Sequence, residues 1–277
     1  MHAIANRQQA EAWNDWEGAH WAEHAERYDA MMGAFNEPLF AAAGITAGHR
    51  VLDVGCGTGQ TTRLAARRAY DGEAVGIDLS APMLDRARRD AAADGVGNVT
   101  FVQGDAQVHP LPARAFDVLL SRGGVMFFAD HVAAFTHLRH SLAPTGRLAF
   151  LGPQPEGPDS AYARATAALS PFLREASPAA RGMGSLLDPA RIREVLTAAG
   201  YTDIDVTPAE APMTFGADAA DAADFLLAMG PVRHNLRDAE PETTTRIHAE
   251  LRDSFREFEI SGGVRIPGYV WIVTASA

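Results

Sequence analysis

The stretch that decides the fold is Val51-Leu-Asp-Val-Gly-Cys-Gly-Thr-Gly-Gln60. An apolar run leads into three glycines at alternate positions, and Thr61-Thr-Arg-Leu64 then begins a helical pattern. Glycine lets the backbone turn tightly and lets a ligand approach the main chain, while the following helix presents N–H groups to an anion. The pattern predicts a binding loop between a strand and a helix, although tight strand–helix turns also need glycine for structural reasons alone.

Two later strands also end in acidic residues. Ala74-Val-Gly-Ile-Asp78 ends in a carboxylate at the distance expected for binding ribose hydroxyls. Gln103-Gly-Asp-Ala106 places a second carboxylate, Asp105, where an adenine amino group could donate to it. Either acid alone could merely cap the next helix. Because both follow the glycine loop in order, at the carboxyl ends of successive strands, together they predict a nucleotide crevice.

Apolar runs alternate with amphipathic stretches through the first half of the chain. Each run is continuously apolar, which suits strands buried on both faces of a parallel sheet. Ser80, Asp130 and Asp188 stand where they can cap the helices that follow. Repeated strand–helix units predict an α/β fold with a doubly wound, mostly parallel sheet. The expected strands of this part are Val51–Gly55, Ala74–Asp78, Val99–Asp105, Phe116–Ser121 and Arg147–Leu151.

The regular alternation of strand and helix patterns stops after Pro153, where Pro, Ala and Ser become frequent. We expect helices near 161–173, 189–199, 218–229 and 242–258, and strands at 204–206 and 269–274. The expected organisation is an N-terminal helical extension or lid (1–48), a cofactor-binding core (49–153), a cap insertion (154–187), the core continued (188–207), a second cap insertion (208–263) and a final core strand (264–277).

Composition narrows the function classes. The chain has 277 residues, of which 47% are hydrophobic, so a large buried core can form. A formal charge of −11 argues against a nucleic-acid-binding surface. All 24 basic residues are arginine, which excludes lysine Schiff-base chemistry, and Cys56 is the single cysteine, which excludes a disulfide framework and a Cys-rich zinc site. We expect no metal site, no membrane span and a cytoplasmic location.

The motifs together resemble the class I S-adenosylmethionine-dependent methyltransferases, particularly the subfamily of ubiquinone and menaquinone biosynthesis methyltransferases. The glycine loop matches the first motif of that family, and Gly76-Ile-Asp-Leu-Ser-Ala-Pro-Met83 matches the second. Phe116-Asp-Val118 and the turn Leu142-Ala-Pro-Thr-Gly146 match later ones, with Thr145 where glycine is usual. The resemblance implies a seven-stranded Rossmann-like sheet with helical cap insertions. Gln60, where a nicotinamide-binding loop would need glycine, argues against an NAD enzyme.

The resemblance also implies roles for individual residues. The methionine part of S-adenosylmethionine would lie on Asp53 and the glycine loop, Asp78 would bind the ribose, and Asp105 with Ala106 would recognise the adenine. S-adenosylhomocysteine would be the product. The full set of implied cofactor-binding residues is Asp53, Gly55, Cys56, Gly57, Gly59, Asp78, Leu79, Met83, Gly104, Asp105, Ala106, Ser121 and Arg122.

The catalytic residue is not assigned, because methyl transfer depends mainly on positioning and needs a base only if the acceptor must lose a proton. Tyr28, His24 and His131 are the candidates, and Tyr28 lies in an aromatic-rich N-terminal segment that either anchors a helix or covers the site. Apolar residues after Gly123-Gly124 and in the second insertion favour a mostly apolar small-molecule acceptor, methylated on O, C or N, in secondary metabolism for example.

Two alternative functions stay open. The first keeps the cofactor fold but performs decarboxylation or cyclisation, with the sulfonium as an electrostatic helper. The second is a binding module that holds the cofactor without turnover. The three strand-end acids favour cofactor binding in every case, so they do not separate these classes. The sequence leaves the oligomeric state, the acceptor and the acceptor atom undetermined.

Overall fold

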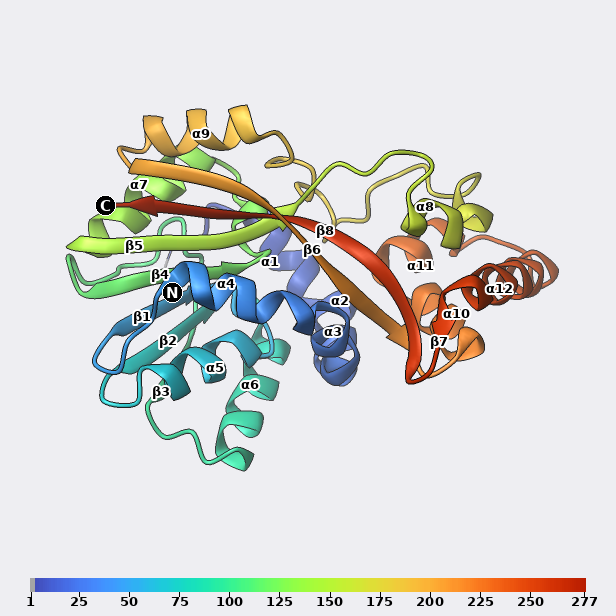
Figure 1. Cartoon of the computed structure of the whole chain (residues 1–277), viewed down its shortest axis with the longest axis horizontal. Helices are drawn as coiled ribbons and strands as arrows, with labels where there is room; N and C mark the ends of the chain where they lie inside the picture. The colour runs from blue at the N-terminus through green and yellow to red at the C-terminus, as the bar shows by residue number, and fades with distance from the viewer. Residues whose placement is uncertain (1–2) are drawn as a thin grey trace.

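A computed structural model describes residues 3–277, and its central feature is a twisted sheet (Figure 1). Its strands follow the order β3-β2-β1-β4-β5-β8-β6, with the short β7 paired to β8. The pairs from β3 to β5 are parallel, and β8 is antiparallel to β5 and β6. The bounds are β1 Arg50–Val54, β2 Glu73–Asp78, β3 Val99–Gln103, β4 Phe116–Arg122, β5 Leu142–Pro153, β6 Thr202–Gly216, β7 Glu259–Ile260 and β8 Gly263–Ser276. The predicted seven-stranded, mostly parallel sheet is therefore confirmed, with one two-residue strand added.

Helices cover both faces of this sheet and the predicted caps form. The Ser80 hydroxyl accepts from Met83 N–H, and Asp130 and Asp188 accept likewise from Ala133 and Ala190. The helices are α1 Arg7–Asn14, α2 Trp16–Glu23, α3 Ala25–Met32, α4 Asn36–Ala43, α5 Gln60–Arg68, α6 Ala81–Ala93, α7 His131–Ser141, α8 Ala161–Ala165, α9 Pro189–Ala198, α10 Ala219–Ala228, α11 Gly230–Leu236 and α12 Pro241–Phe255. Short 3₁₀ turns are η1 Gly33–Phe35, η2 Val125–Phe127, η3 Ala167–Leu169 and η4 Arg256–Phe258.

Alternate residues of each central strand enter different cores. Leu52 and Leu119 pack with Phe135 of α7, while Val51 and Val118 pack with Leu39 of α4, and all six are fully buried. Burial of both strand faces is the reason the strands read as continuous apolar runs. The two cores fix the sheet between its helix layers, so the strand ends form a fixed edge.

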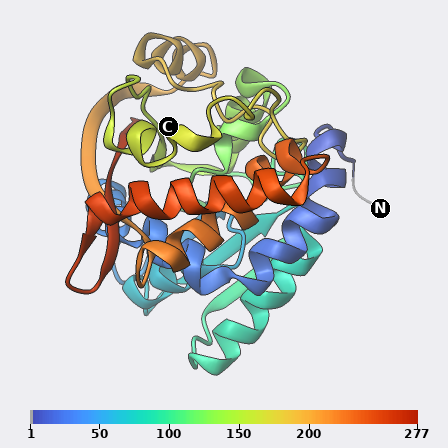
Figure 2. The same ribbon diagram turned by 90° about the vertical axis from the view of Figure 1, so that its right-hand side faces the viewer.

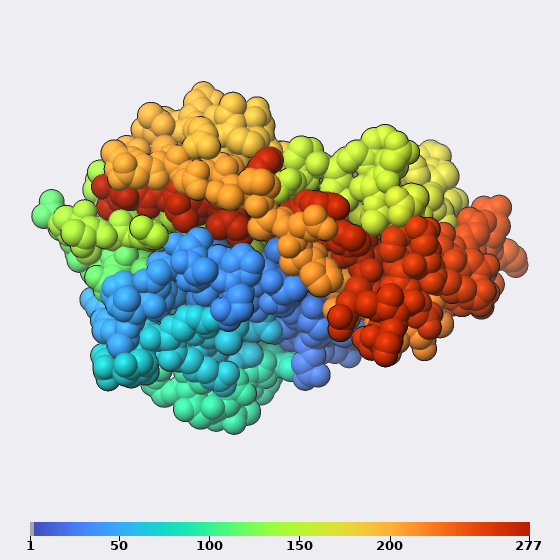
Figure 3. Space-filling view, viewed as in Figure 1, coloured from blue at the N-terminus to red at the C-terminus, as the bar shows by residue number. Residues whose placement is uncertain are grey.

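The long strands β6 and β8 continue beyond the sheet and carry a cap of α8, α10, α11 and α12 (Figure 1). Figure 2 looks onto this cap and shows α12 lying across it, with the N-terminal helices beside it. Figure 3 shows the cap at one end of the molecule, continuous with the rest of the surface. Its own core includes Phe225, Leu251 and Phe255, and Tyr28 of α3 belongs to it too. The N-terminal extension therefore bridges the sheet and the cap.

The predicted second insertion, 208–263, starts too early, because β6 runs on to Gly216 and the insertion occupies 217–262 instead. Pro208 and Pro212 suggested an end to the strand. Proline is tolerated here because β6 lies at the edge of the sheet, where one side of the strand donates no ladder hydrogen bonds. The expected helix 161–173 is also wrong in length: α8 ends at Ala165, and only the turn η3 follows before Pro171.

Two other stretches differ from the prediction. The expected strand 147–151 starts earlier, at Leu142, with an irregularity in its pairing to β4 around the Pro144 turn. Helix α11 was not predicted, because its first residues, Gly230 and Pro231, suggested a loop.

Among the described residues, no helix is both long and apolar enough to cross a membrane.

Candidate functional site

The glycine loop connects β1 to α5 with left-handed backbone at three positions. Gly55, Gly57 and Gly59 have φ angles of 68°, 53° and 77°. A Cβ on Gly55 would lie 2.6 Å from the Cα of Gly124, the residue that lines the loop from the end of β4. Glycine is therefore required here by packing as well as by conformation. Gly59 precedes α5 and has no side chain to cap it, so the start of α5 is open to an anion.

Asp78, at the end of β2, is tied to this loop by its carboxylate. One oxygen accepts from Gly57 N–H and the other from Ser80 N–H, both at 2.8 Å. A carboxylate oxygen can accept two hydrogen bonds, so each keeps acceptor capacity. The side chain is half-buried, and burial raises its pKa. The arrangement leaves Asp78 able to bind a pair of hydroxyl groups beside the glycine loop.

Asp53 lies beneath the loop and is fully buried. Its Oδ2 accepts from the hydroxyls of Thr61 (2.7 Å) and Thr62 (2.6 Å), which fastens the start of α5 to β1. Its Oδ1 is buried without a hydrogen-bond partner. Burial, opposed by the two threonine hydroxyls, raises the pKa of Asp53 to about 6. An unpartnered buried acceptor is costly, and a cationic donor would satisfy this one.

Asp105, after β3, is bound by the N-terminal segment of the chain. Its carboxylate accepts from the N–H groups of Ala5 and Asn6, from the Asn6 side-chain amide at 2.7 Å and from Gln107 N–H. The side-chain amide oxygen of Asn6 in turn accepts from Ala129 N–H. Four donors fill the capacity of one carboxylate. Asp105 is only 1% exposed, so nothing else can donate to it while this segment stays in place.

The helices that follow this segment cover the Leu79–Ser80 turn after β2. Asn14 donates to the Leu79 carbonyl and accepts from Ala81 N–H, and the Ser80 hydroxyl donates to the Trp13 carbonyl at 2.6 Å. A Cβ on Gly18 of α2 would lie 1.9 Å from that same carbonyl, so α2 passes in close contact with it. The N-terminal extension is thus fixed to two of the predicted cofactor turns.

Arg122, at the end of β4, joins the N-terminal extension to the glycine loop. Its guanidinium donates to Asp29 of α3 at 2.8 Å, to Asn36 of α4 at 2.9 Å and to Gln60 of α5. The Arg122 and Asp29 side chains are only 15% and 13% exposed. Burial raises the pKa of Asp29, and Arg122 opposes that shift. Next to it, the buried Ser121 hydroxyl donates to the Val54 carbonyl and accepts from Gly124 N–H, so it braces the strand ends.

The remaining predicted cofactor residues surround the same edge of the sheet. Met83 at the start of α6 and Ala106 after β3 are nearly buried, at 6% and 8% exposure. A Cβ on Gly57 would lie 2.8 Å from the Met83 methyl carbon, and one on Gly104 would lie 2.5 Å from the His109 ring. Cys56 is buried, and burial raises the pKa of its thiol, so it is an unreactive packing residue of the loop.

The arrangement of loop and strand-end acids agrees with what comparison with known proteins finds. Residues 51–146 match the family model described as a methyltransferase domain. Trans-aconitate 2-methyltransferase of Methylobacterium radiotolerans is 33% identical over 208 residues, which cover 74% of this chain and 76% of that protein. The chain belongs to the class I S-adenosylmethionine-dependent methyltransferase family. S-adenosylmethionine is the cofactor of this family, and the matched region spans β1 to the first residues of β5.

Other relatives cover less of the molecule. Demethylmenaquinone methyltransferase of Thermus thermophilus is 42% identical over 110 residues, which cover 39% of this chain and 50% of that protein, so the chain spans about half the length of that relative. The YcgJ protein of Bacillus subtilis has a similar fold, with a TM-score of 0.58 at 21% identity, covering 87% of this chain and 97% of that one. The match to the menaquinone enzyme therefore extends over less than half of this chain.

The three catalytic candidates lie in different surroundings. Tyr28 is 3% exposed, and its hydroxyl has no hydrogen-bond partner. His24 lies at the junction of α2 and α3, with its ring 4.5 Å from that of His20. His131 is held between the Met126 carbonyl at 3.3 Å and the Ser185 hydroxyl at 3.1 Å. Because these bonds join η2 to the 154–187 insertion, His131 has a structural contact in this arrangement.

Three residues of the site were missed by the sequence analysis. Asn6 and Asp29 lie far from every recognised motif, and only the fold brings them to Asp105 and Arg122. The third missed residue is His20, four residues before the candidate His24 in the same aromatic-rich segment. A signal existed for Asp29, because it directly follows the singled-out Tyr28 in a helical stretch. Asn6 gave no such signal, since a polar residue near a helix start usually only caps it.

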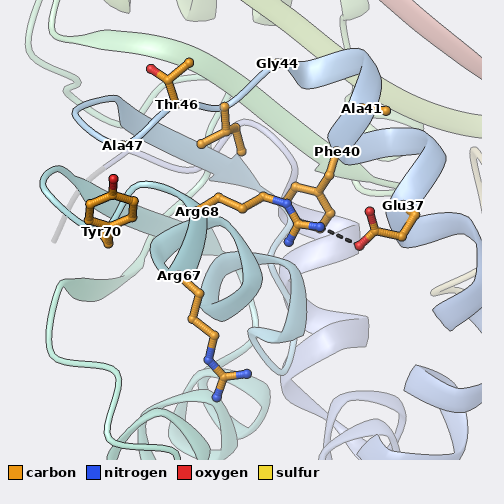
Figure 4. A pocket seen from close by; sticks show the side chains of 10 residues that line it. Glu37, Phe40, Ala41, Gly44, Thr46, Ala47, Arg67, Arg68 and Tyr70 are labelled. Atoms are coloured by element: carbon orange, nitrogen blue, oxygen red, sulfur yellow. Dashed lines mark hydrogen bonds and ion pairs between the residues drawn. The ribbon is translucent and has the colours of Figure 1, made fainter.

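A surface hollow between α4 and α5 lies away from this site (Figure 4). Glu37, Phe40, Arg68 and Tyr70 line it, and Arg68 pairs with Glu37 while lying 4.1 Å above the Phe40 ring. It opens next to the residues that precede β1 and β2, at the opposite edge of the sheet from the carboxyl ends. Within residues 3–277, no group of three or more His, Cys, Asp and Glu is placed to hold a metal ion.

Proposed function

We propose that the chain transfers a methyl group from S-adenosylmethionine to a mostly apolar small molecule. The observation that carries the proposal is the Asp78 carboxylate, which the glycine loop and Ser80 orient while each oxygen keeps acceptor capacity. Vicinal ribose hydroxyls are the ligand that suits such a pair of acceptors beside a glycine-rich turn. When bound, the cofactor supplies an electrophilic methyl group on a sulfonium.

The remaining parts of the cofactor have matching groups. The unpartnered Asp53 Oδ1 suits the methionine ammonium, and the open start of α5 suits its carboxylate. Asp105 can accept from the adenine amino group once Ala5 and Asn6 leave it. The same segment then acts as a lid over the adenine end, in line with the predicted role of residues 1–48.

The acceptor site in this proposal is a cluster of five aromatic side chains: Trp13, Trp21, Tyr28, Phe127 and Phe225. Trp21 stacks on Tyr28 at 3.6 Å, and Phe225 of the cap lies 5.1 Å from Tyr28. Trp13 contacts both Trp21 and Phe127, which is in η2 beyond the end of β4. The aromatic cluster therefore reaches from the cap to the edge that holds the glycine loop, and aromatic faces favour both an apolar acceptor and a sulfonium.

Calorimetric titration with S-adenosylmethionine and S-adenosylhomocysteine tests the cofactor half, with NAD as the control ligand. Asp78→Ala should weaken both affinities by about 10- to 100-fold, the value of one or two hydrogen bonds to a charged group. The matched control is Asp85→Ala, which removes an exposed acid paired with Arg88 on α6. Equal affinities for the wild type and Asp78→Ala would remove the ribose assignment.

Labelled methyl donor separates methyl transfer from the two alternatives. Transfer of label to an acceptor supports the proposal. Product formation with the label retained on the cofactor indicates decarboxylation or cyclisation. Tight cofactor binding with no turnover of any acceptor indicates a binding module. A neutral amine can attack the methyl group without first losing a proton, whereas methylation of a hydroxyl group or of a carbon atom releases a proton that a base must take. The acceptor atom is therefore decided by the polar groups around the aromatic cluster.

A further inference from the structure

Two polar atoms at the edge of the aromatic cluster are buried without hydrogen-bond partners. They are Tyr28 Oη and His20 Nε2, on side chains that are 3% and 7% exposed. The two rings meet edge to face, 6.0 Å apart between centroids. A buried polar group without a partner destabilises the protein, so native structures rarely keep one without a ligand, water or catalytic role. Two neighbouring ones at a proposed acceptor site point to a shared ligand.

Packing holds the two rings in place. Trp16 stacks on His20, with the ring centroids 4.6 Å apart. The Arg233 guanidinium of α11 lies over the Trp16 ring, 3.9 Å from its centroid. Tyr28 is held between Trp21 and Phe225. Neither ring can turn to find a partner without breaking these stacks. The aromatic stacks therefore hold both unpartnered atoms in fixed positions.

Burial lowers the pKa of His20 to about 4, and burial raises the pKa of Tyr28. At neutral pH the imidazole is therefore uncharged and the phenol keeps its proton. With its ring proton on Nδ1, His20 can accept a hydrogen bond at Nε2, while Tyr28 can donate one. The titratable and charged groups around His20 are Glu17, Glu23, His24, Tyr28 and Arg233.

We propose that Tyr28 Oη and His20 Nε2 together bind a hydroxyl group of the acceptor, and that His20 takes its proton during methyl transfer. A hydroxyl oxygen can accept from Tyr28, donate to His20 and still keep a lone pair for attack. A neutral amine that accepts from Tyr28 has no lone pair left. A carboxylate has no proton to give. The acceptor is therefore an aromatic or otherwise apolar alcohol, phenol or enol, and the chain an O-methyltransferase.

In this step the hydroxyl oxygen bonds to the methyl carbon as the carbon–sulfur bond breaks. The hydroxyl proton moves to His20 Nε2, and uncharged S-adenosylhomocysteine leaves, so the positive charge passes from sulfur to the imidazolium. The Glu23 carboxylate favours this charge on His20, while burial and His24 oppose it. The proposal rests on the methyl-transfer function proposed above.

Binding to the S-adenosylhomocysteine complex tests the proposal without turnover. The probes are 2-naphthol, its methyl ether 2-methoxynaphthalene, which lacks the proton, and 2-naphthoate, which carries a carboxylate instead. We expect 2-naphthol to bind at least about tenfold more tightly than either analogue, and Tyr28→Phe to reduce that affinity about tenfold. If the protein binds S-adenosylhomocysteine but the complex does not bind 2-naphthol, or binds 2-naphthoate more tightly, the proposed hydroxyl site is wrong. Failure to bind S-adenosylhomocysteine would instead overturn the cofactor proposal.

Methylation of 2-naphthol with labelled donor tests the proton transfer. His20→Gln keeps a hydrogen-bond acceptor but no base, so KM should change less than about threefold while kcat falls at least about 100-fold. His20→Leu should lose binding as well. The matched control, His49→Gln, changes a histidine at the opposite edge of the sheet and should leave both constants unchanged. If His20→Gln keeps full turnover, or if the wild type binds 2-naphthol without methylating it, His20 is not the base.

Discussion

Replacing Asn6 by alanine should make the chain bind S-adenosylmethionine more tightly. In the structure the Asp105 carboxylate is filled by four N–H donors, three of them from Ala5 and Asn6. An adenine amino group can donate to Asp105 only after some of these leave. The seated segment and the adenine therefore compete, and the apparent dissociation constant equals the intrinsic one divided by the fraction of chains with the segment released.

The size of the effect follows from the bonds that the substitution removes. Asn6→Ala deletes the amide donor to a charged acceptor, worth about 1.5–3 kcal/mol, while Ala129 N–H is exposed enough to find water instead. A loss of about 2 kcal/mol in seating changes the released fraction about 30-fold, as long as the seated state dominates. The apparent affinity should rise by about 10- to 30-fold. Asn6→Asp, which places a like charge beside Asp105, should act in the same direction.

Isothermal titration calorimetry gives the affinities, and stopped-flow mixing gives the association rate, which should rise too. Unfolding curves of the apoprotein control for misfolding. A folded Asn6→Ala protein that binds the cofactor more weakly would refute the competition, because the segment would then support the adenine site instead of occupying it. Asp105→Ala should weaken binding in either case, and so confirms that the carboxylate is part of the site.

Three further changes test the energetics of the site and core. Burial raises the pKa of Asp53 to about 6 from its ordinary value of 3.8. Between these values the folded state binds more protons than the unfolded state, so stability falls as pH rises. Asp53→Asn should remove that decline, up to about 3 kcal/mol, in urea unfolding from pH 4 to 7. Asp29→Asn leaves the buried Arg122 cation without its carboxylate and should lower the free energy of unfolding by about 3 kcal/mol in the same assay. The double variant that also carries Arg122→Met should lose less. If the losses of the two single variants simply add in the double variant, Asp29 and Arg122 are not coupled. Phe135→Ala empties a fully buried ring position among three other aromatic rings and should cost about 3–5 kcal/mol, whereas a cost under 1 kcal/mol would mean that the core collapses onto the cavity.

The sheet could be predicted from the sequence because its strands are buried on both faces and end in recognisable turns. The sequence reveals the glycine loop and the strand-end acids Asp53 and Asp78 by their spacing, because the backbone of the loop permits few residues other than glycine. The edge strand β6 could not be predicted at full length, because exposed alternation and two prolines look like a loop until an edge position is known. Edge strands carry less sequence constraint than central ones.

The polar network over the site was even less accessible to prediction. Asn6 and Asp105 are 99 residues apart, and Asp29 and Arg122 are 93 apart. Each pair is a tertiary contact between a helix segment and a strand end, and neither member has a periodic pattern around it. A buried carboxylate can be satisfied by any nearby donor, so composition does not reveal which part of the chain supplies it.

The close contact of α2 with the Leu79–Ser80 turn has a kinetic consequence. The same helix carries His20 and Trp21 at the proposed acceptor site, so one wall serves both substrates. Exchange of the nucleotide requires this wall to lift, which dismantles the acceptor site at the same moment. Turnover should then be ordered, with the methyl donor entering first and its spent form leaving last. Steady-state inhibition by S-adenosylhomocysteine should be competitive against S-adenosylmethionine and noncompetitive against the acceptor.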